Sequence, residues 1–144
     1  MKIVYIAHPI GGDVENNLKS IREIVREINL KEPEIVPFVP YYADVVSMDD
    51  SIEEERDRGI KNDLAILKKP GMVDELRLYG PRISLGMLQE IKVALNMGIP
   101  IVATSRKMEL AMVFTEIFGE FKTHQIGAYT AYTGVFDIKT LGSK

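Results

Sequence analysis

The clearest pattern of hydrophobic and polar positions lies in residues 82–102, RISLGMLQEIKVALNMGIPIV. Apolar side chains recur there at three- and four-residue spacing, which is typical of a helix with one buried face. Gly98 and Pro100 end the pattern, because glycine tolerates the positive φ of a helix C-terminus and proline cannot continue a helix. The segment therefore predicts a tight loop, a helix that ends at Gly98, and a short buried strand.

The first turns of this predicted helix carry candidate chemistry. A helix N-terminus presents unpaired N–H groups and a positive partial charge, so Ser84 and the adjacent backbone can hold an anionic or polyhydroxyl ligand. Glu90 lies about one and a half turns further along, where it can face the same ligand. Two plainer interpretations stay open: Ser84 as a simple N-cap and Glu90 as a solvated surface carboxylate.

The first forty residues predict strand, helix and strand. Residues 2–7 form a nearly continuous apolar run, as expected for a central strand of a parallel sheet. Residues 14–29 show a helical stripe with Asp13 or Asn16 as its cap, and residues 34–40 predict a second strand. Because prolines interrupt it, this second strand is expected to be short or at an edge.

The middle and end of the chain continue the alternation. Ser51 and Glu54 fit a capping box that would open a helix over residues 52–67, with Asp63 beside its apolar stripe. The remaining predictions are an irregular connector over residues 41–46, strands over residues 72–79 and 99–104, a helix over residues 107–118, and a tail of weak strand character over residues 127–141.

This alternation predicts one domain, residues 1–144, built as an α/β doubly wound parallel sheet of the flavodoxin or Rossmann type with helices on both faces. In such a sheet the loops at residues 8–13, 41–44 and 80–86 fall along one edge. Ligands of open α/β sheets bind at the carboxyl ends of the strands. We therefore expect a cleft for a small molecule there.

Composition narrows the function. With a net charge of −3 the chain has no basic field to attract a nucleic acid polymer or an anionic membrane. It has no cysteine and only two histidines, which excludes thiolate chemistry and disfavours a metal site, and we expect no cofactor. The sequence shows no membrane span and no signal peptide, so a cytoplasmic protein is expected.

Three motifs together resemble a known superfamily. Residues 5–12 (YIAHPIGG), 62–64 (NDL) and 84–90 (SLGMLQE) occur in the order seen in the nucleoside 2-deoxyribosyltransferase superfamily, which includes the 2′-deoxynucleoside 5′-monophosphate N-hydrolases. Residues 73–76, 82–84 and 98–100 are also similar to the DUF4406-like branch, whose members are often encoded by phages or prophages. The resemblance covers roughly residues 1–104, and residues 105–144 are not diagnostic.

The resemblance implies an enzyme that cleaves the N-glycosidic bond of a nucleoside or nucleotide, by hydrolysis or by base transfer. Glu90 would be the nucleophile that attacks C1′, Asp63 a carboxyl group near the departing base, and Tyr5 a phenol beside the nucleophile. It also implies at least a homodimer whose sites are completed across the interface. The substrate-binding residues expected from it are His8, Pro9, Ile10, Gly11, Gly12, Arg82, Ser84 and Gly86.

Ser84 favours a substrate with a 5′-phosphate, whereas Gly11 disfavours one. The resemblance implies that a serine at position 84 donates to a 5′-phosphate, where transferases of unphosphorylated nucleosides tend to have aspartate. The monophosphate hydrolases, however, place an arginine in the first loop where this chain has Gly11. Arg82 is a candidate replacement from the other side of the cleft.

Two other functions remain as alternatives. The missing arginine at Gly11 favours a non-catalytic, regulatory nucleotide-binding module of phage or prophage origin. A phosphoribohydrolase of the lysine-decarboxylase-like group also cleaves an N-glycosidic bond, but its Pro-Gly-Gly-x-Gly-Thr-x-x-Glu loop is absent from this chain.

Overall fold

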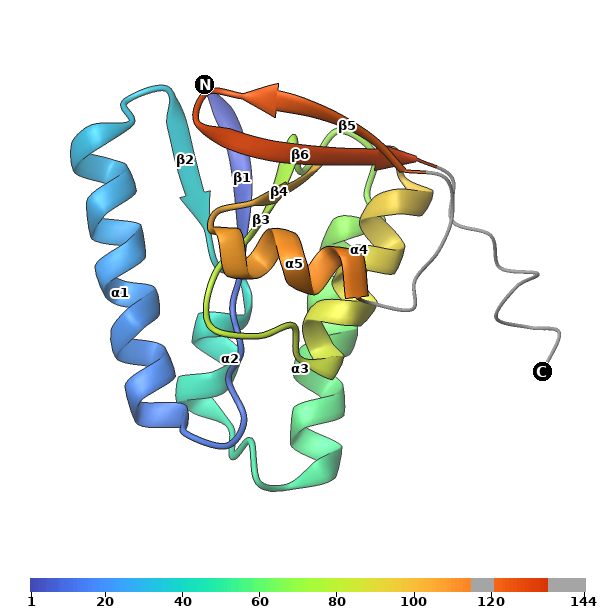
Figure 1. The fold of residues 1–144 in the computed structure, drawn as a ribbon. Coiled ribbons are helices and arrows are strands. Elements are labelled where there is room, and N and C mark those ends of the chain that lie inside the picture. Colours follow the sequence, from blue (N-terminus) through green and yellow to red (C-terminus); the bar gives the residue numbers. More distant parts are fainter. Residues whose placement is uncertain (115–120, 135–144) are drawn as a thin grey trace, which may run out of the picture.

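A computed structural model describes residues 1–114 and 121–134 of the chain (Figure 1). In chain order the elements are β1 (Lys2–Ala7), α1 (Val14–Lys31), β2 (Ile35–Phe38), α2 (Tyr41–Ser47), α3 (Glu53–Leu67), β3 (Glu75–Leu78), α4 (Leu85–Asn96), β4 (Ile101–Ala103), α5 (Arg106–Phe114), β5 (Phe121–Ile126) and β6 (Tyr129–Gly134).

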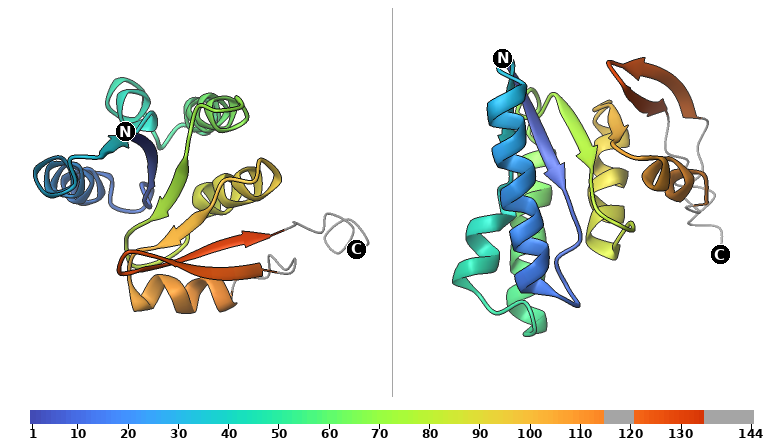
Figure 2. Two further views of the ribbon diagram at one scale, coloured as in Figure 1. Left: turned by 90° about the horizontal axis from the view of Figure 1, so that it is seen from above. Right: turned by 60° about the vertical axis from the view of Figure 1, so that its left-hand side comes forward.

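The described strands form one sheet in the order β2-β1-β3-β4-β6-β5. The first four strands are parallel, whereas β6 runs antiparallel to β4 and β5 antiparallel to β6. Viewed from above, α1 and α5 lie on one side of the sheet and α3 and α4 on the other (Figure 2). The doubly wound α/β fold is thus confirmed, and the strand order reverses between β1 and β3, where such folds bind ligands.

Strand β1 has the bounds predicted from its apolar run, and its side chains supply both faces of the core. Val4 and Ile6 pack on the α1 side with Ile28, while Tyr5 and Ala7 belong to the larger cluster that includes residues of α3 and α4. The prediction of a short or edge position for β2 is also confirmed, because β2 has four residues and, among the described strands, pairs only with β1. The face of β1 that carries Tyr5 therefore borders the candidate site, and the opposite face packs against α1.

Strand β3 differs from the alternating strand predicted over residues 72–79, because all four of its residues are buried. Arg77 occupies a polar position of the alternation, yet it is only 3% exposed. Its Nε donates to Glu75 at 2.7 Å, its Nη1 donates to Glu32 at 3.1 Å, and its guanidinium lies 5.5 Å from the ring centre of Tyr129. Ionic and cation–π partners from α1 and β6 therefore let a charged face of β3 lie inside the protein.

The connector predicted over residues 41–46 is wrong, because this segment is helix α2. Pro40 precedes the helix with φ −63°, a value that suits a helix start. Tyr41 is buried, and its hydroxyl donates to the carbonyl oxygen of Ile6 at 2.6 Å. A contact with β1, which no local pattern reveals, thus fixes the first turn of α2.

The predicted capping box of α3 is also wrong. The residue before the helix is Ile52, and no side chain caps it. Ser51 instead donates through Oγ to Asp49 at 2.6 Å, in a turn that precedes the helix. The helix still spans Glu53–Leu67, close to the predicted range, because Leu67 is fully buried and anchors its inner face.

At the C-terminal end the structure adds a strand that the pattern does not predict. The predicted tail contains β6, but β5 lies in a stretch without an assigned element, and the two strands form an antiparallel hairpin rather than a continuation of the parallel sheet. The predicted residues 115–118 and 135–141 lie outside the described residues. No helix in residues 1–114 and 121–134 has the length and apolar character needed to cross a membrane.

Candidate active site

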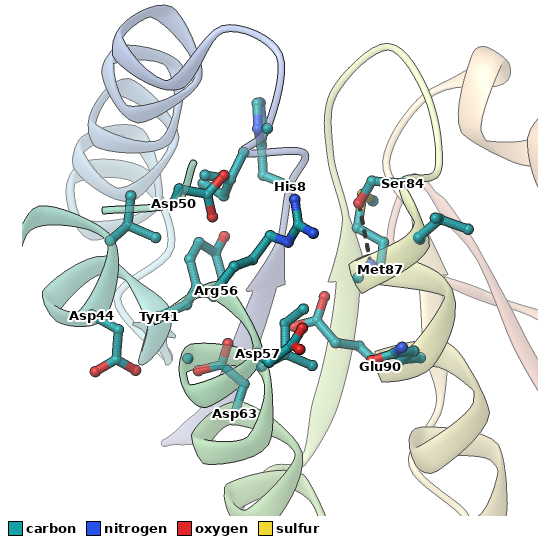
Figure 3. Close-up of a pocket in the computed structure, with 18 of the residues that line it drawn as sticks. His8, Tyr41, Asp44, Asp50, Arg56, Asp57, Asp63, Ser84, Met87 and Glu90 are labelled. Carbon is teal, nitrogen blue, oxygen red and sulfur yellow. Dashed lines mark hydrogen bonds between the residues drawn. The ribbon is translucent and has the colours of Figure 1, made fainter. Parts of the chain in front are cut away.

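A cavity of about 580 Å³ lies at the carboxyl ends of β1 and β3, where the strand order reverses (Figure 3). Its walls come from the loop after β1, from α2 and α3, and from the loop and first turns of α4. The structure brings together, as lining residues, the predicted His8, Ile10, Gly11, Gly12, Asp63, Arg82, Ser84, Gly86 and Glu90. Pro9 and Tyr5 do not line the cavity, although both lie directly behind it.

Ser84 is the N-cap of α4. Its Oγ accepts a hydrogen bond from the backbone N–H of Met87 at 3.2 Å. Accepting that bond uses a lone pair of the hydroxyl, which keeps its own proton for a donor role. A cap and a ligand contact are therefore compatible at Ser84. At the other end, Gly98 has φ +70°, as the predicted helix end requires.

Glu90 is buried in the wall of the cavity, with 7% of its surface exposed. Burial is the main cause that raises the pKa of its carboxyl group from 4.5 to about 8, a hydrogen-bonding effect of Tyr5 opposes this rise, and the charge of Asp63 adds to it. Glu90 is therefore not the solvated helix carboxylate of the plain interpretation.

Tyr5 is fully buried, and its hydroxyl lies close to the carboxyl group of Glu90. Its ring packs against Phe38 and Tyr41 at centroid distances of 6.4 and 6.1 Å. Burial, with the neighbouring carboxyl groups, raises the pKa of the hydroxyl well above 10, so it stays a donor. The hydroxyl faces Glu90 closely enough to influence its pKa, but it lacks a well-formed hydrogen bond, which leaves its proton available to the carboxylate.

Asp63 is the second buried carboxyl group of the cavity, with 7% of its surface exposed and one oxygen without a hydrogen-bond partner. Burial, followed by the charge of Asp44, raises its pKa from 3.8 to about 7. Asp63 and Glu90 therefore exchange protons with solvent in the same range near neutral pH, which suits a pair that divides the roles of acid and nucleophile.

The first loop packs closely against the loop after β3. Gly80 has φ +96°, and a Cβ atom there would lie 2.8 Å from Pro9 Cδ, so this approach requires glycine. His8 shares a 2.7 Å hydrogen bond between Nδ1 and the carbonyl oxygen of Pro9. Burial lowers the pKa of His8, so the ring is neutral near pH 7, with Nδ1 donating and Nε2 left as an acceptor.

Two guanidinium groups reach the cavity. Arg82 Nη2 donates to the carbonyl oxygen of Gly11 at 3.3 Å, so this side chain lies over the loop after β1. Arg56, which the sequence patterns do not single out, extends from α3 into the cavity (Figure 3). Its run of charged neighbours is typical of a solvated face, and only the fold shows that this end of α3 borders the site.

Tyr41 and Asp44 of α2 also line the cavity, at the edge of the sheet where the sequence places residues 41–44. The sequence patterns assign neither residue a role in the site. Within residues 1–114 and 121–134, no group of three histidine, aspartate or glutamate side chains could hold a metal ion.

Comparisons with known proteins place the chain in a family and include a distant structural likeness. A family profile described as a domain of unknown function, DUF7768, matches residues 2–104. No curated protein matches the sequence. The 2-deoxyribosyltransferase of the psychrotolerant bacterium Bacillus psychrosaccharolyticus is similar at 20% identity over 69% of each chain, with a TM-score of 0.49. A likeness at this level does not bear on the chemistry of the site.

We predict that Glu90→Gln stabilises the protein at alkaline pH. Between pH 4.5 and about 8 the unfolded chain loses a proton that native Glu90 keeps, so wild-type stability falls as pH rises through this window and then levels off. Glutamine removes this loss, and the variant should gain on the order of 2–5 kcal/mol over wild type at pH 8.5, but almost nothing at pH 4.5. Urea unfolding at both pH values measures the difference, and an equal effect at both would contradict it.

Proposed function

The chain belongs to the DUF7768 family, and we propose that it cleaves the N-glycosidic bond of a 2′-deoxynucleotide or 2′-deoxynucleoside through Glu90. The observation that carries this proposal is the burial of Tyr5, Asp63 and Glu90 against one another at a cavity of substrate size. Two buried acids that form no ion pair within the described residues are costly, and such groups are typical of catalytic sites.

In the proposed reaction, the Glu90 carboxylate attacks C1′ of the sugar as the bond from C1′ to the base nitrogen breaks. Asp63 transfers its proton to the departing base, and a glycosyl ester of Glu90 remains. Water, or a nitrogen of a second base, then attacks C1′ and releases Glu90, and the proton lost by the attacking group returns to Asp63.

Tyr5 supports the charged form of the nucleophile. Its buried hydroxyl can donate to Glu90 when this carboxyl group ionises, because the hydroxyl has no other partner. The same contact orients Glu90 toward the cavity, since the ring of Tyr5 is held between Phe38 and Tyr41.

The groups at the mouth of the cavity suit an anionic end of the substrate. Ser84 and the free N–H groups of the first turn of α4 lie on the same cavity as Arg82 and Arg56. The position of Arg82 over Gly11 supports its role as the replacement for the arginine of the hydrolases. We therefore favour a 5′-monophosphate over an unphosphorylated nucleoside.

The competing hypothesis is a non-catalytic nucleotide-binding module, which the absence of an arginine at Gly11 favours. It predicts a rise in melting temperature with nucleotides but no turnover. The homodimer, the cytoplasmic location and the relationship to the DUF4406-like phage branch stay predictions.

We expect the wild-type protein to release free base from at least one member of a panel of deoxynucleosides and their 5′-monophosphates, followed by chromatography. Glu90→Gln should lower release at least about 10³-fold, because the ester cannot form. Glu23→Gln, which changes an exposed carboxylate on α1, is the matched control and should behave as wild type. No release by the wild-type protein, or equal release by Glu90→Gln, would contradict the proposal.

The pH dependence of kcat/KM should be bell-shaped with its maximum between about 7 and 8, where the pair holds one proton. Below this range both groups are protonated and Glu90 cannot attack; above it both are ionised and Asp63 cannot protonate the base. Because Glu90 has the higher pKa, the reactive form, with Glu90 ionised and the proton on Asp63, is the minority of the one-proton molecules at the maximum. Asp63→Asn should remove the alkaline limb for substrates whose base needs a proton to leave. A flat profile in the wild-type protein between pH 5 and pH 9 would be inconsistent with this pair.

Ser84→Asp separates capping from phosphate binding, because aspartate caps helices as well as serine does but repels a phosphate. We expect kcat/KM for the 5′-monophosphate to fall roughly tenfold or more, while the value for the matching nucleoside and the melting temperature stay close to wild type. An equal fall for both substrates would show that Ser84 contributes only through the helix.

A further inference from the structure

Asp44 is a third carboxyl group in the wall of the cavity, and it comes from an element that the sequence did not suggest. It is half-buried on α2 and lies on the same side of the cavity as Asp63, with Glu90 opposite (Figure 3). Asp44 has no role in the reaction proposed above, although its charge raises the pKa of Asp63.

The packing of α2 on α3 holds Asp44 beside Asp63. Gly59 of α3 has no side chain at the contact, and a Cβ atom there would lie 3.6 Å from Asp44 Cβ. Asn62, the residue before Asp63, donates from Nδ2 to Asp44 Oδ2 at 3.4 Å. Asn62 is itself held by Arg58, whose Nε donates to its Oδ1 at 3.2 Å. This chain of contacts orients the Asp44 carboxylate toward the part of α3 that carries the acid.

We propose that Asp44 is a positioning residue of this site, whose negative charge keeps the proton on Asp63 until the base departs. The proposal rests on the proposed function, in which Asp63 is the acid. A carboxylate near a second carboxyl group disfavours ionisation of the second group, and this effect is strong where water is excluded. After the base has left with the proton, the same repulsion makes Asp63 a better acceptor for the proton of the attacking group.

The other groups that face Asp63 do not replace this charge. Tyr5 of β1 and Tyr41 of α2 are neutral near pH 7, because burial raises both of their pKa values well above 10. Glu90 of α4 has the same sign as Asp44 when it is ionised. On α3 itself, Arg56 and Asp57 line the cavity, and within the described residues neither Arg56 nor any other cation forms an ion pair with Asp63.

Asp44→Asn tests the proposal, because asparagine keeps the shape of the side chain and an oxygen that can accept from Asn62 while it removes the charge. The side-chain carboxyl ¹³C signal of Asp63, assigned with Asp63→Asn, is followed by NMR from pH 4 to pH 9 without substrate. We expect the midpoint of Asp63 to move to lower pH in Asp44→Asn. The midpoint should keep its wild-type value in Glu54→Gln, which removes an exposed charge of α3, and should stay raised in Asp44→Glu, which retains the charge.

An unchanged midpoint in Asp44→Asn, or an equal movement in Glu54→Gln, would overturn the proposal. Because no substrate is present, this result is independent of whether the protein releases bases. In the kinetic assay the alkaline limb should move to lower pH, with kcat at pH 8 falling roughly three- to tenfold more than kcat at pH 6. A purely structural role would instead lower kcat equally at both pH values and would also overturn the assignment.

Discussion

A carboxyl group that leaves water without a cation beside it is unstable in its charged form. Glu90 and Asp63 are both in this position, and within the described residues neither forms an ion pair. The protein therefore holds protons on them in a pH range where exposed carboxyl groups are fully ionised. The proposed division of roles, the part given to Tyr5 and the influence of Asp44 all follow from this single constraint.

The scaffold creates the constraint by bringing separate elements to one point. Because the strand order reverses between β1 and β3, the helices that follow these strands, α1 and α4, lie on opposite sides of the sheet (Figure 2). The cavity lies at this point and is bordered by α2, α3 and α4. A small residue makes one of these approaches tight, since Gly80 leaves room for Pro9. In such a site the carboxyl groups of Asp63 and Glu90 are buried, whereas the part of the cavity that Ser84 and Arg82 line is open to solvent.

Local patterns are sufficient where an element depends on its own residues. They predict β1, α1 and α4 with good bounds, and they place Ser84 and Glu90 on the same helix. They fail where the structure depends on distant partners: the first turn of α2 is held by the burial of Tyr41 and its bond to β1, so the helix was missed. Residues 41–44 were expected at the cleft, but Tyr41 and Asp44 were given no role in it. The resemblance to a superfamily singled out Tyr5 and Asp63, but only the fold shows that Arg56 reaches the same cavity.

The buried ion network of β3 bears on the register of the sheet. Leu76 and Leu78 belong to the core cluster shared with α4, and Arg77 meets its partners Glu75 and Glu32 on the opposite face. A slip of β3 by one residue would turn Arg77 into the core cluster that contains Tyr5 and place a permanent cation on the face of the sheet that carries the acids. Such a cation would hold Glu90 and Asp63 ionised together. The ion pairs of Arg77 with Glu75 and Glu32 therefore favour the observed register of β3. In this register no cation of β3 faces Glu90 and Asp63, and these carboxyl groups can still gain and lose a proton near neutral pH.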